Sequence, residues 1–163
     1  MFQPTVQNLS IEQCLSDEVT AMSELASLLK KEQAALASND IEALGITTAG
    51  KTELLRTIAG LEKIRSSKLV ALGFNGKPEG MQSYFSQHPT ETAQSSVLWE
   101  KLLSISEQAK EDNRTNGLLI NRRLSHNQAA LTVLGHGSST GSLYGPTGQT
   151  TISAGSMKGM IPR

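Results

Sequence analysis

The chain has few of the residues that metal, redox and disulfide-stabilised proteins depend on. Its 163 residues include a single cysteine, Cys14, so neither an internal disulfide nor a C-x-x-C metal or redox motif can form. The three histidines, His88, His126 and His136, are far apart and lack the spacing of a zinc site. We therefore expect no metal and no cofactor.

Aromatic residues, net charge and long apolar runs are also scarce. Aromatic residues make up 4% of the chain, so its core must be aliphatic. Fifteen basic and fifteen acidic residues balance, which gives no long-range attraction to nucleic acid or anionic membrane. No apolar run approaches the ~20 residues of a membrane helix, and the N-terminus lacks the features of a signal peptide. A cytoplasmic protein without membrane insertion is expected.

Motifs for catalysis are missing as well. No G-x-S-x-G nucleophile elbow occurs in the chain. Acidic pairs such as Asp17–Glu18 and Glu111–Asp112 are adjacent in sequence, so their carboxylates point to different sides of a helix. The sequence therefore predicts no catalytic residues and a protein that is not an enzyme.

Long amphipathic segments dominate the chain instead. Their apolar residues recur three, four or seven positions apart, which places them on one face of a helix. Capping-box sequences, Ser10-Ile-Glu-Gln13 and Asn39-Asp-Ile-Glu42, precede the first two segments. We expect an all-α fold, an antiparallel long-helix bundle with coiled-coil-like packing over residues 1–134. Its three main helices should cover residues 10–37, 40–72 and 92–134, joined at 73–91 by a connector that includes a short helical patch.

The third predicted helix carries a continuous seam. Eleven residues keep an alternation of three and four positions, with one slip: Trp99, Leu102, Ser106, Ala109, Asn113, Asn116, Ile120, Leu124, Asn127, Leu131 and Leu134. Such a pattern is typical of coiled coils, in which a seam asparagine fixes register and partner choice. The three asparagines of this seam could instead face solvent. Both readings are open at this point.

The composition changes at Gly135. Residues 135–163 are rich in Gly, Ser and Thr and nearly free of charge, so they cannot bury enough surface to offset their ordering entropy. We expect a flexible tail with isolated apolar residues such as Leu143 and Tyr144. Such a tail suits a segment that orders on meeting a partner.

A phosphate-loop motif occurs at Gly45-Ile-Thr-Thr-Ala-Gly50-Lys51-Thr52. This motif binds phosphate only where it joins a buried β-strand to a helix. The residues before Gly45 contain no strand-like apolar run, and no alternation of strands and helices follows. We expect this stretch to be helical, with a small P-loop NTPase as the weaker alternative.

A set of short motifs is spread along the chain. The helical stretches are Leu28-Leu-Lys-Lys-Glu-Gln-Ala-Ala-Leu36, Asp40-Ile-Glu-Ala-Leu44, Lys51, Leu54-Leu55 and Leu61-Glu62 through Arg65. The others are Asn113-Arg-Thr-Asn116-Gly117 and Tyr144-Gly-Pro-Thr-Gly148-Gln149. Together these stretches resemble FlgN-type flagellar export chaperones. The resemblance implies a cytoplasmic type III secretion chaperone that binds hook–filament junction subunits, prevents their premature assembly and delivers them to the export gate.

The resemblance also implies where partners bind. The family's substrate-binding region matches the end of the third helix and the tail, and its gate-docking tyrosine matches Tyr144. The residues carried over for substrate binding are Leu119, Ile120, Leu124, Leu131, Leu134 and Leu143. A self-associating structural coiled-coil protein is the alternative, and whether the chain forms a homodimer is left open.

Overall fold

The computed structural model describes residues 10–137, and within this range the chain is helical without strands. The all-α prediction is confirmed. The chain divides into two units, residues 1–120 and 121–163. The second unit begins within the last helix, and the predicted boundary at residue 134 stays a prediction. The tail, with Leu143 and Tyr144, lies outside the described residues.

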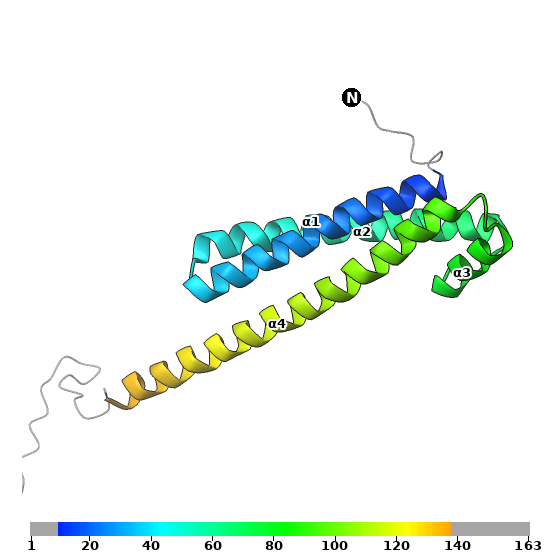
Figure 1. The fold of residues 1–163 in the computed structure, drawn as a ribbon. Coiled ribbons are helices and arrows are strands. Elements are labelled where there is room, and N and C mark those ends of the chain that lie inside the picture. The colour runs from blue at the N-terminus through cyan, green and yellow to red at the C-terminus, as the bar shows by residue number, and fades with distance from the viewer. Residues whose placement is uncertain (1–9, 138–163) are drawn as a thin grey trace, which may run out of the picture. The chain divides into compact units, whose positions relative to one another are not determined.

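Helices α1 (Ile11–Ser38) and α2 (Ile41–Ala71) form an antiparallel hairpin in the first unit and lie side by side (Figure 1). The Ser10 hydroxyl accepts a hydrogen bond from the Gln13 backbone N–H, as the first capping box requires. The Gln13 side chain donates to Asp17 instead of reaching back to Ser10. The predicted box is therefore half formed.

The turn between α1 and α2 differs from the expected capping box. Asn39 ends α1 in the left-handed region, at φ 60°, and its N–H donates to the Ala35 carbonyl. Asp40, rather than Asn39, caps α2 by accepting a hydrogen bond from the Ala43 N–H. Asn tolerates the left-handed conformation, so it suits the C-terminal end of the preceding helix.

The connector contains a helix, α3 (Pro78–Gln87). Gly73 precedes it at φ 85°, the left-handed conformation expected of a helix C-cap glycine. Gly80 is buried against the loop before it, because a Cβ at this position would lie 1.6 Å from the Asn75 carbonyl oxygen. The loop and α3 can therefore pack together only with glycine here.

The last helix, α4 (Ala93–Gly137), crosses from the first unit into the second. Two apolar clusters form the core of the first unit, and α4 contributes Trp99, Leu102 and Ala109 to them. The larger cluster gathers near α3; its buried residues are Ile11, Leu15, Val19, Leu69, Met81, Trp99 and Leu102. The smaller consists of Leu25, Leu29 and Ala109, packed against Leu54 and Ile58 of α2. The described part of the chain has no helix long and apolar enough to cross a membrane.

Candidate partner-binding surface

A buried ion pair and a stacked indole connect all three long helices within the first unit. Arg65 of α2 donates from Nε to the Glu18 carboxylate of α1, at 2.7 Å, and both side chains are buried. The Arg65 guanidinium also lies over the Trp99 ring of α4, 4.8 Å from its centroid. Burial raises the pKa of Glu18, and the Arg65 hydrogen bond opposes this shift.

A second polar cluster lies nearer the turn between α1 and α2. The Glu32 carboxylate of α1 accepts one hydrogen bond from Lys51 Nζ of α2, at 2.8 Å, and another from Asn116 Nδ2 of α4, at 2.7 Å. The same Asn116 nitrogen donates to the Leu29 carbonyl. Because Glu32 and Asn116 are buried and hydrogen bonds connect all three side chains, they fix the position of this part of α4 along the hairpin.

Asp112, one turn before Asn116, adds a third polar contact between α1 and α4. Its Oδ1 accepts hydrogen bonds from Lys30 Nζ, at 2.7 Å, and from Gln108 Nε2. The Lys30 hydrogen bond holds the pKa of Asp112 below its ordinary value. Among the described residues, the buried atoms Asp112 Oδ2 and Asn116 Oδ1 have no hydrogen-bond partner.

These polar contacts were missed in the sequence, although a signal existed. The apolar residues of the α1 seam keep a three-four alternation only when Glu18 and Glu32 complete it; they are Ile11, Leu15, Met22, Leu25, Leu29 and Leu36. An acidic residue within an apolar seam indicates a buried partner. The open question about the seam asparagines of α4 is also answered, because Asn116 is buried whereas Asn113 and Asn127 are exposed.

The phosphate-loop alternative is contradicted. Gly45–Thr52 lies entirely within α2, and the residues before Asp40 form α1, so no strand enters the motif. Gly50 faces Leu28 of α1, 3.1 Å from where a Cβ would be. Lys51 is bound to Glu32 rather than directed at a phosphate site. The motif is a helical coincidence.

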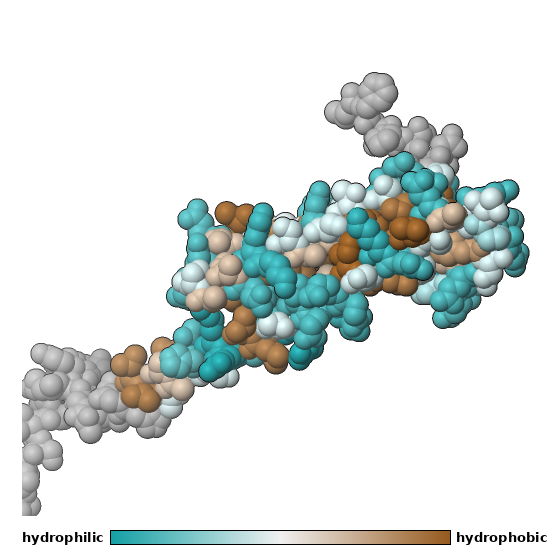
Figure 2. Space-filling model, viewed as in Figure 1, coloured by the Kyte–Doolittle hydropathy of each residue, from teal (hydrophilic) through white to brown (hydrophobic). Residues whose placement is uncertain are grey.

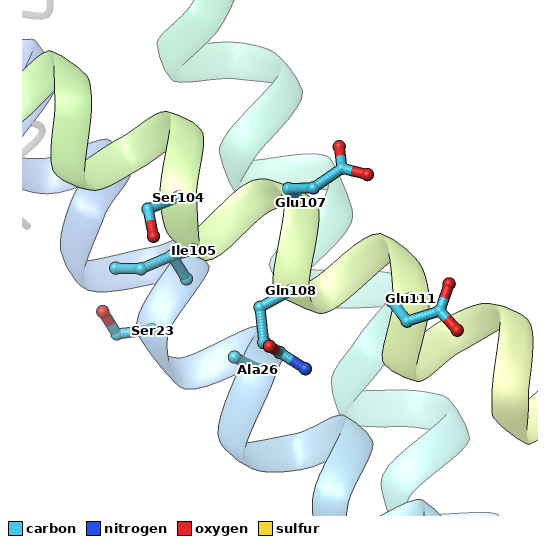
Figure 3. Close-up of a pocket in the computed structure, with 7 residues that line it drawn as sticks. All are labelled: Ser23, Ala26, Ser104, Ile105, Glu107, Gln108 and Glu111. Carbon is cyan, nitrogen blue, oxygen red and sulfur yellow. The ribbon is translucent and has the colours of Figure 1, made fainter.

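A groove lies between α1 and α4 (Figure 3). Its lining residues are Ser23, Ala26, Ser104, Ile105, Glu107, Gln108 and Glu111. Ile105 and Gln108 point toward α1, whereas the carboxylates of Glu107 and Glu111 point away from it. Arg114 binds Glu111 and holds the pKa of its carboxyl below the ordinary value. The groove offers no cluster of acid, base and nucleophile, and no group of potential metal ligands occurs among the described residues.

The remaining feature is an exposed apolar stripe on the C-terminal part of α4. We define the C-terminal stripe as Ile120, Leu124, Asn127, Leu131 and Leu134, which follow one another at alternating intervals of four and three residues. Ile120, Leu124, Leu131 and Leu134 are 45%, 55%, 68% and 70% exposed. Apolar side chains are visible at the surface along this part of the helix (Figure 2). The stripe therefore continues the face that packs Trp99, Leu102 and Ala109 in the core, but without burial.

The residues expected to bind a partner differ in their exposure to solvent. Leu124, Leu131 and Leu134 lie in the second unit, and Ile120 lies at the end of the first. These four side chains are exposed, whereas Leu119 is half-buried. Leu118 and Val133 are exposed too, on other sides of the helix, and were not anticipated. Within the first unit the seam is buried at Trp99, Leu102, Ala109 and Asn116.

Comparison with known proteins finds the same name, FlgN, in a family model and in two relatives. The family model described as FlgN protein matches residues 5–152. Two relatives named Flagella synthesis protein FlgN, from Yersinia enterocolitica and from its serotype O:8 / biotype 1B strain, are each 29% identical over 138 residues. The matches cover 82% of this chain and 84% of each relative. No solved structure matches the chain.

Proposed function

Since the chain belongs to the FlgN family, we propose that it acts in flagella synthesis as a cytoplasmic secretion chaperone for hook–filament junction subunits. The chaperone would bind a terminal helix of the subunit, prevent premature assembly and deliver the subunit to the export gate. It would do so without catalysis. The observation that carries this proposal is the exposed C-terminal stripe on a continuous helix.

The stripe has the chemistry that helix pairing needs. Burying one exposed Leu or Ile contributes roughly 1.5–3 kcal/mol, and the stripe offers four such residues. Association costs at least about 4 kcal/mol in lost freedom, so the stripe can support measurable binding without supporting very tight binding. A reversible complex of this kind suits a chaperone that must release its cargo.

Binding can be tested with the full chain and purified junction subunits by isothermal titration calorimetry. The double variant Leu124→Ser/Leu131→Ser should weaken binding by at least about tenfold, which corresponds to 1.4 kcal/mol. Val97→Ser is the matched control, because Val97 is also an exposed apolar residue of α4 (63%) outside the stripe. Unchanged subunit binding by the double variant would remove the stripe from the proposal.

The proposal also assigns two tail residues, Leu143 to subunit binding and Tyr144 to gate docking. Tyr144→Ala should leave subunit affinity unchanged while reducing export of junction subunits by cells that contain the variant. Leu143→Ser should instead reduce subunit affinity. If Tyr144→Ala lowered subunit affinity as much as Leu143→Ser does, the two roles would not be separate.

The stripe also fits the alternative of self-association, because it has the spacing of a coiled-coil seam. A structural coiled-coil protein would form a stable oligomer through this face. Light scattering on the full chain would then give the mass of a dimer or larger at micromolar concentration, and Leu124→Ser/Leu131→Ser would return the monomer. If the unmodified chain and the double variant are both monomers, the chaperone function is favoured over the structural one.

A further inference from the structure

The chain contains two Asn-Gly dipeptides, Asn75–Gly76 and Asn116–Gly117. In such a dipeptide the backbone nitrogen of the glycine can attack the asparagine side chain. Glycine hinders this attack least, because it has no Cβ. The local sequence is therefore equally reactive at both places, and the structure decides which asparagine can react.

The dipeptide Asn116–Gly117 lies inside α4 and is protected there. The helix fixes the ψ angle of Asn116, whereas attack requires this angle to rotate until the next backbone nitrogen meets the side-chain carbon. Asn116 is 1% exposed. Its Nδ2, the nitrogen that would have to leave, donates hydrogen bonds to Glu32 and to the Leu29 carbonyl. The Asn116 side chain is therefore held away from the reaction.

The dipeptide Asn75–Gly76 lies in the loop between α2 and α3, and the Asn75 side chain is exposed. Asn75 Oδ1 accepts a hydrogen bond from the Lys77 backbone N–H, at 3.0 Å. Attack on the side-chain carbonyl places negative charge on this oxygen. A backbone N–H that already points at Oδ1 stabilises the developing charge, as a donor of an oxyanion hole does.

We propose that Asn75 is a site of spontaneous deamidation and that Asn116 is not. The Gly76 backbone nitrogen loses its proton to hydroxide and forms a bond to Asn75 Cγ. The bond from Cγ to Nδ2 then breaks, and Nδ2 leaves as ammonia after taking up a proton from water. The product is a five-membered succinimide, which water opens to aspartate or isoaspartate. Water is the co-reactant, and no group is oxidised or reduced.

Isoaspartate at position 75 would displace α3. It leads the main chain through the former side chain and lengthens the backbone by one carbon. The Asn75 carbonyl lies against Gly80, and Gly76 lies against Ser66 of α2, so closely that a Cβ on either glycine would collide with its neighbour. A longer backbone therefore moves the start of α3 and uncovers Met81, which is fully buried in the larger apolar cluster.

Peptide mapping of the full chain tests the choice of site, after incubation at about pH 8, where loss of the amide proton is favoured. Trypsin places Asn75 in the peptide 69–101, as its single asparagine, and Asn116 in the peptide 115–122. Deamidation adds about one dalton, and fragmentation of each peptide locates the change. Asn75 should deamidate at least about tenfold faster than Asn116 in the folded chain. Equal rates, or a faster reaction at Asn116, would overturn the proposal.

Unfolding provides a control within the same chain. In concentrated urea neither asparagine is held by a helix or a loop, so the two rates should agree within about threefold. A tenfold difference that persists in urea would assign the selectivity to the local sequence and overturn the structural argument.

The variant Lys77→Pro tests the backbone donor. Proline has no N–H, and the φ angle of Lys77, −86°, is close to the value that proline adopts. Deamidation of Asn75 in the folded chain should be slowed by at least about threefold. An unchanged rate would show that the Lys77 N–H does not assist the attack.

Hydrogen exchange tests the displacement of α3 after anion exchange has separated the isoaspartate form. The amide hydrogens of α3 should exchange at least about tenfold faster in this form than in the unmodified chain. Asn75→Asp is the matched control, because it has the same added charge on an ordinary backbone and should keep α3 protected. Unchanged exchange in the isoaspartate form would contradict the displacement. None of these measurements involves a junction subunit, so their outcome is independent of the proposed function.

Discussion

Asn116 of α4 donates from Nδ2 to the Glu32 carboxylate of α1 over 2.7 Å, although 84 residues separate them in the chain. Glu32 also accepts from Lys51 of α2, so a single carboxylate connects three helices. Asn116 is the last residue of the α4 seam that is buried, and Ile120 begins the exposed C-terminal stripe. The pair thus includes the last buried residue of the seam within the described part of α4.

Replacing Asn116 by Ala should lower the free energy of unfolding by about 1–3 kcal/mol, because Glu32 and the Leu29 carbonyl lose a buried donor. Urea titration followed by the fluorescence of Trp99, the single tryptophan, measures this change. Asn113→Ala is the matched control: Asn113 is exposed and should change the free energy by less than about 0.5 kcal/mol. Equal effects of the two variants would contradict the role of Asn116.

Removing one partner of the buried Glu18–Arg65 pair should lower the free energy of unfolding far more than replacing both partners by apolar residues. Glu18→Ala leaves the buried Arg65 guanidinium without its carboxylate and should cost about 3–5 kcal/mol. The double variant Glu18→Leu/Arg65→Met should recover most of this loss, since apolar side chains of similar volume avoid desolvation of the charges. Denaturant titration gives both values. A double variant less stable than Glu18→Ala would show that the pair is favourable beyond its burial cost.

The raised pKa of Glu18 predicts a pH dependence. A carboxyl whose pKa is higher in the folded chain binds more protons there than in the unfolded chain, so stability falls as pH rises from its ordinary value of 4.5 through the raised pKa. Glu18→Gln cannot lose a proton and should lack this contribution. The free energy of unfolding of Glu18→Gln, relative to the unmodified chain, should therefore increase between pH 4 and pH 7.

The variant Asp112→Asn should change the pH dependence of stability in the opposite direction to Glu18→Gln. The pKa of Asp112 lies below 3.8 because Lys30 donates to its carboxylate, so its contribution is present above this pH and is lost on acidification. The free energy difference between the unmodified chain and Asp112→Asn should thus shrink as pH falls below about 4. The same direction of change for both variants would contradict one of the two assignments.

Replacement of Gly80 and of Gly60 by alanine should change the free energy of unfolding in opposite directions. Gly80→Ala would place a Cβ against the Asn75 carbonyl, which is backbone and cannot move without displacing α3 or its loop, so a loss of more than about 2 kcal/mol is expected. Gly60→Ala, inside α2 with no atom within 4 Å of the new Cβ, should stabilise the chain by about 0.5–1 kcal/mol. Thermal unfolding followed by circular dichroism compares them. A harmless Gly80→Ala would contradict the close packing of α3.

Much of the fold followed from local chemistry. The repeat of apolar residues predicted three long helices, and Ser10 indicated where the first begins, because caps depend on neighbouring residues alone. Asn39 marked the turn after this helix, although Asp40 rather than Asn39 caps the next helix. The coincidental phosphate-loop motif was recognised for the same reason: the residues before Gly45 could not form a strand. The family resemblance, rather than the pattern itself, suggested Ile120, Leu124, Leu131 and Leu134 as binding residues, and all four are exposed.

Only the tertiary structure decided which residues of the α4 seam are buried. Asn113, Asn116 and Asn127 occupy similar places in the repeat, and the sequence could not tell which is buried, since burial depends on residues far away in the chain. The pairing of Glu18 with Arg65, and of Glu32 with Lys51 and Asn116, depends on contacts between residues up to 84 positions apart. Periodicity determines which face of a helix is apolar, whereas three-dimensional packing determines which part of that face remains exposed.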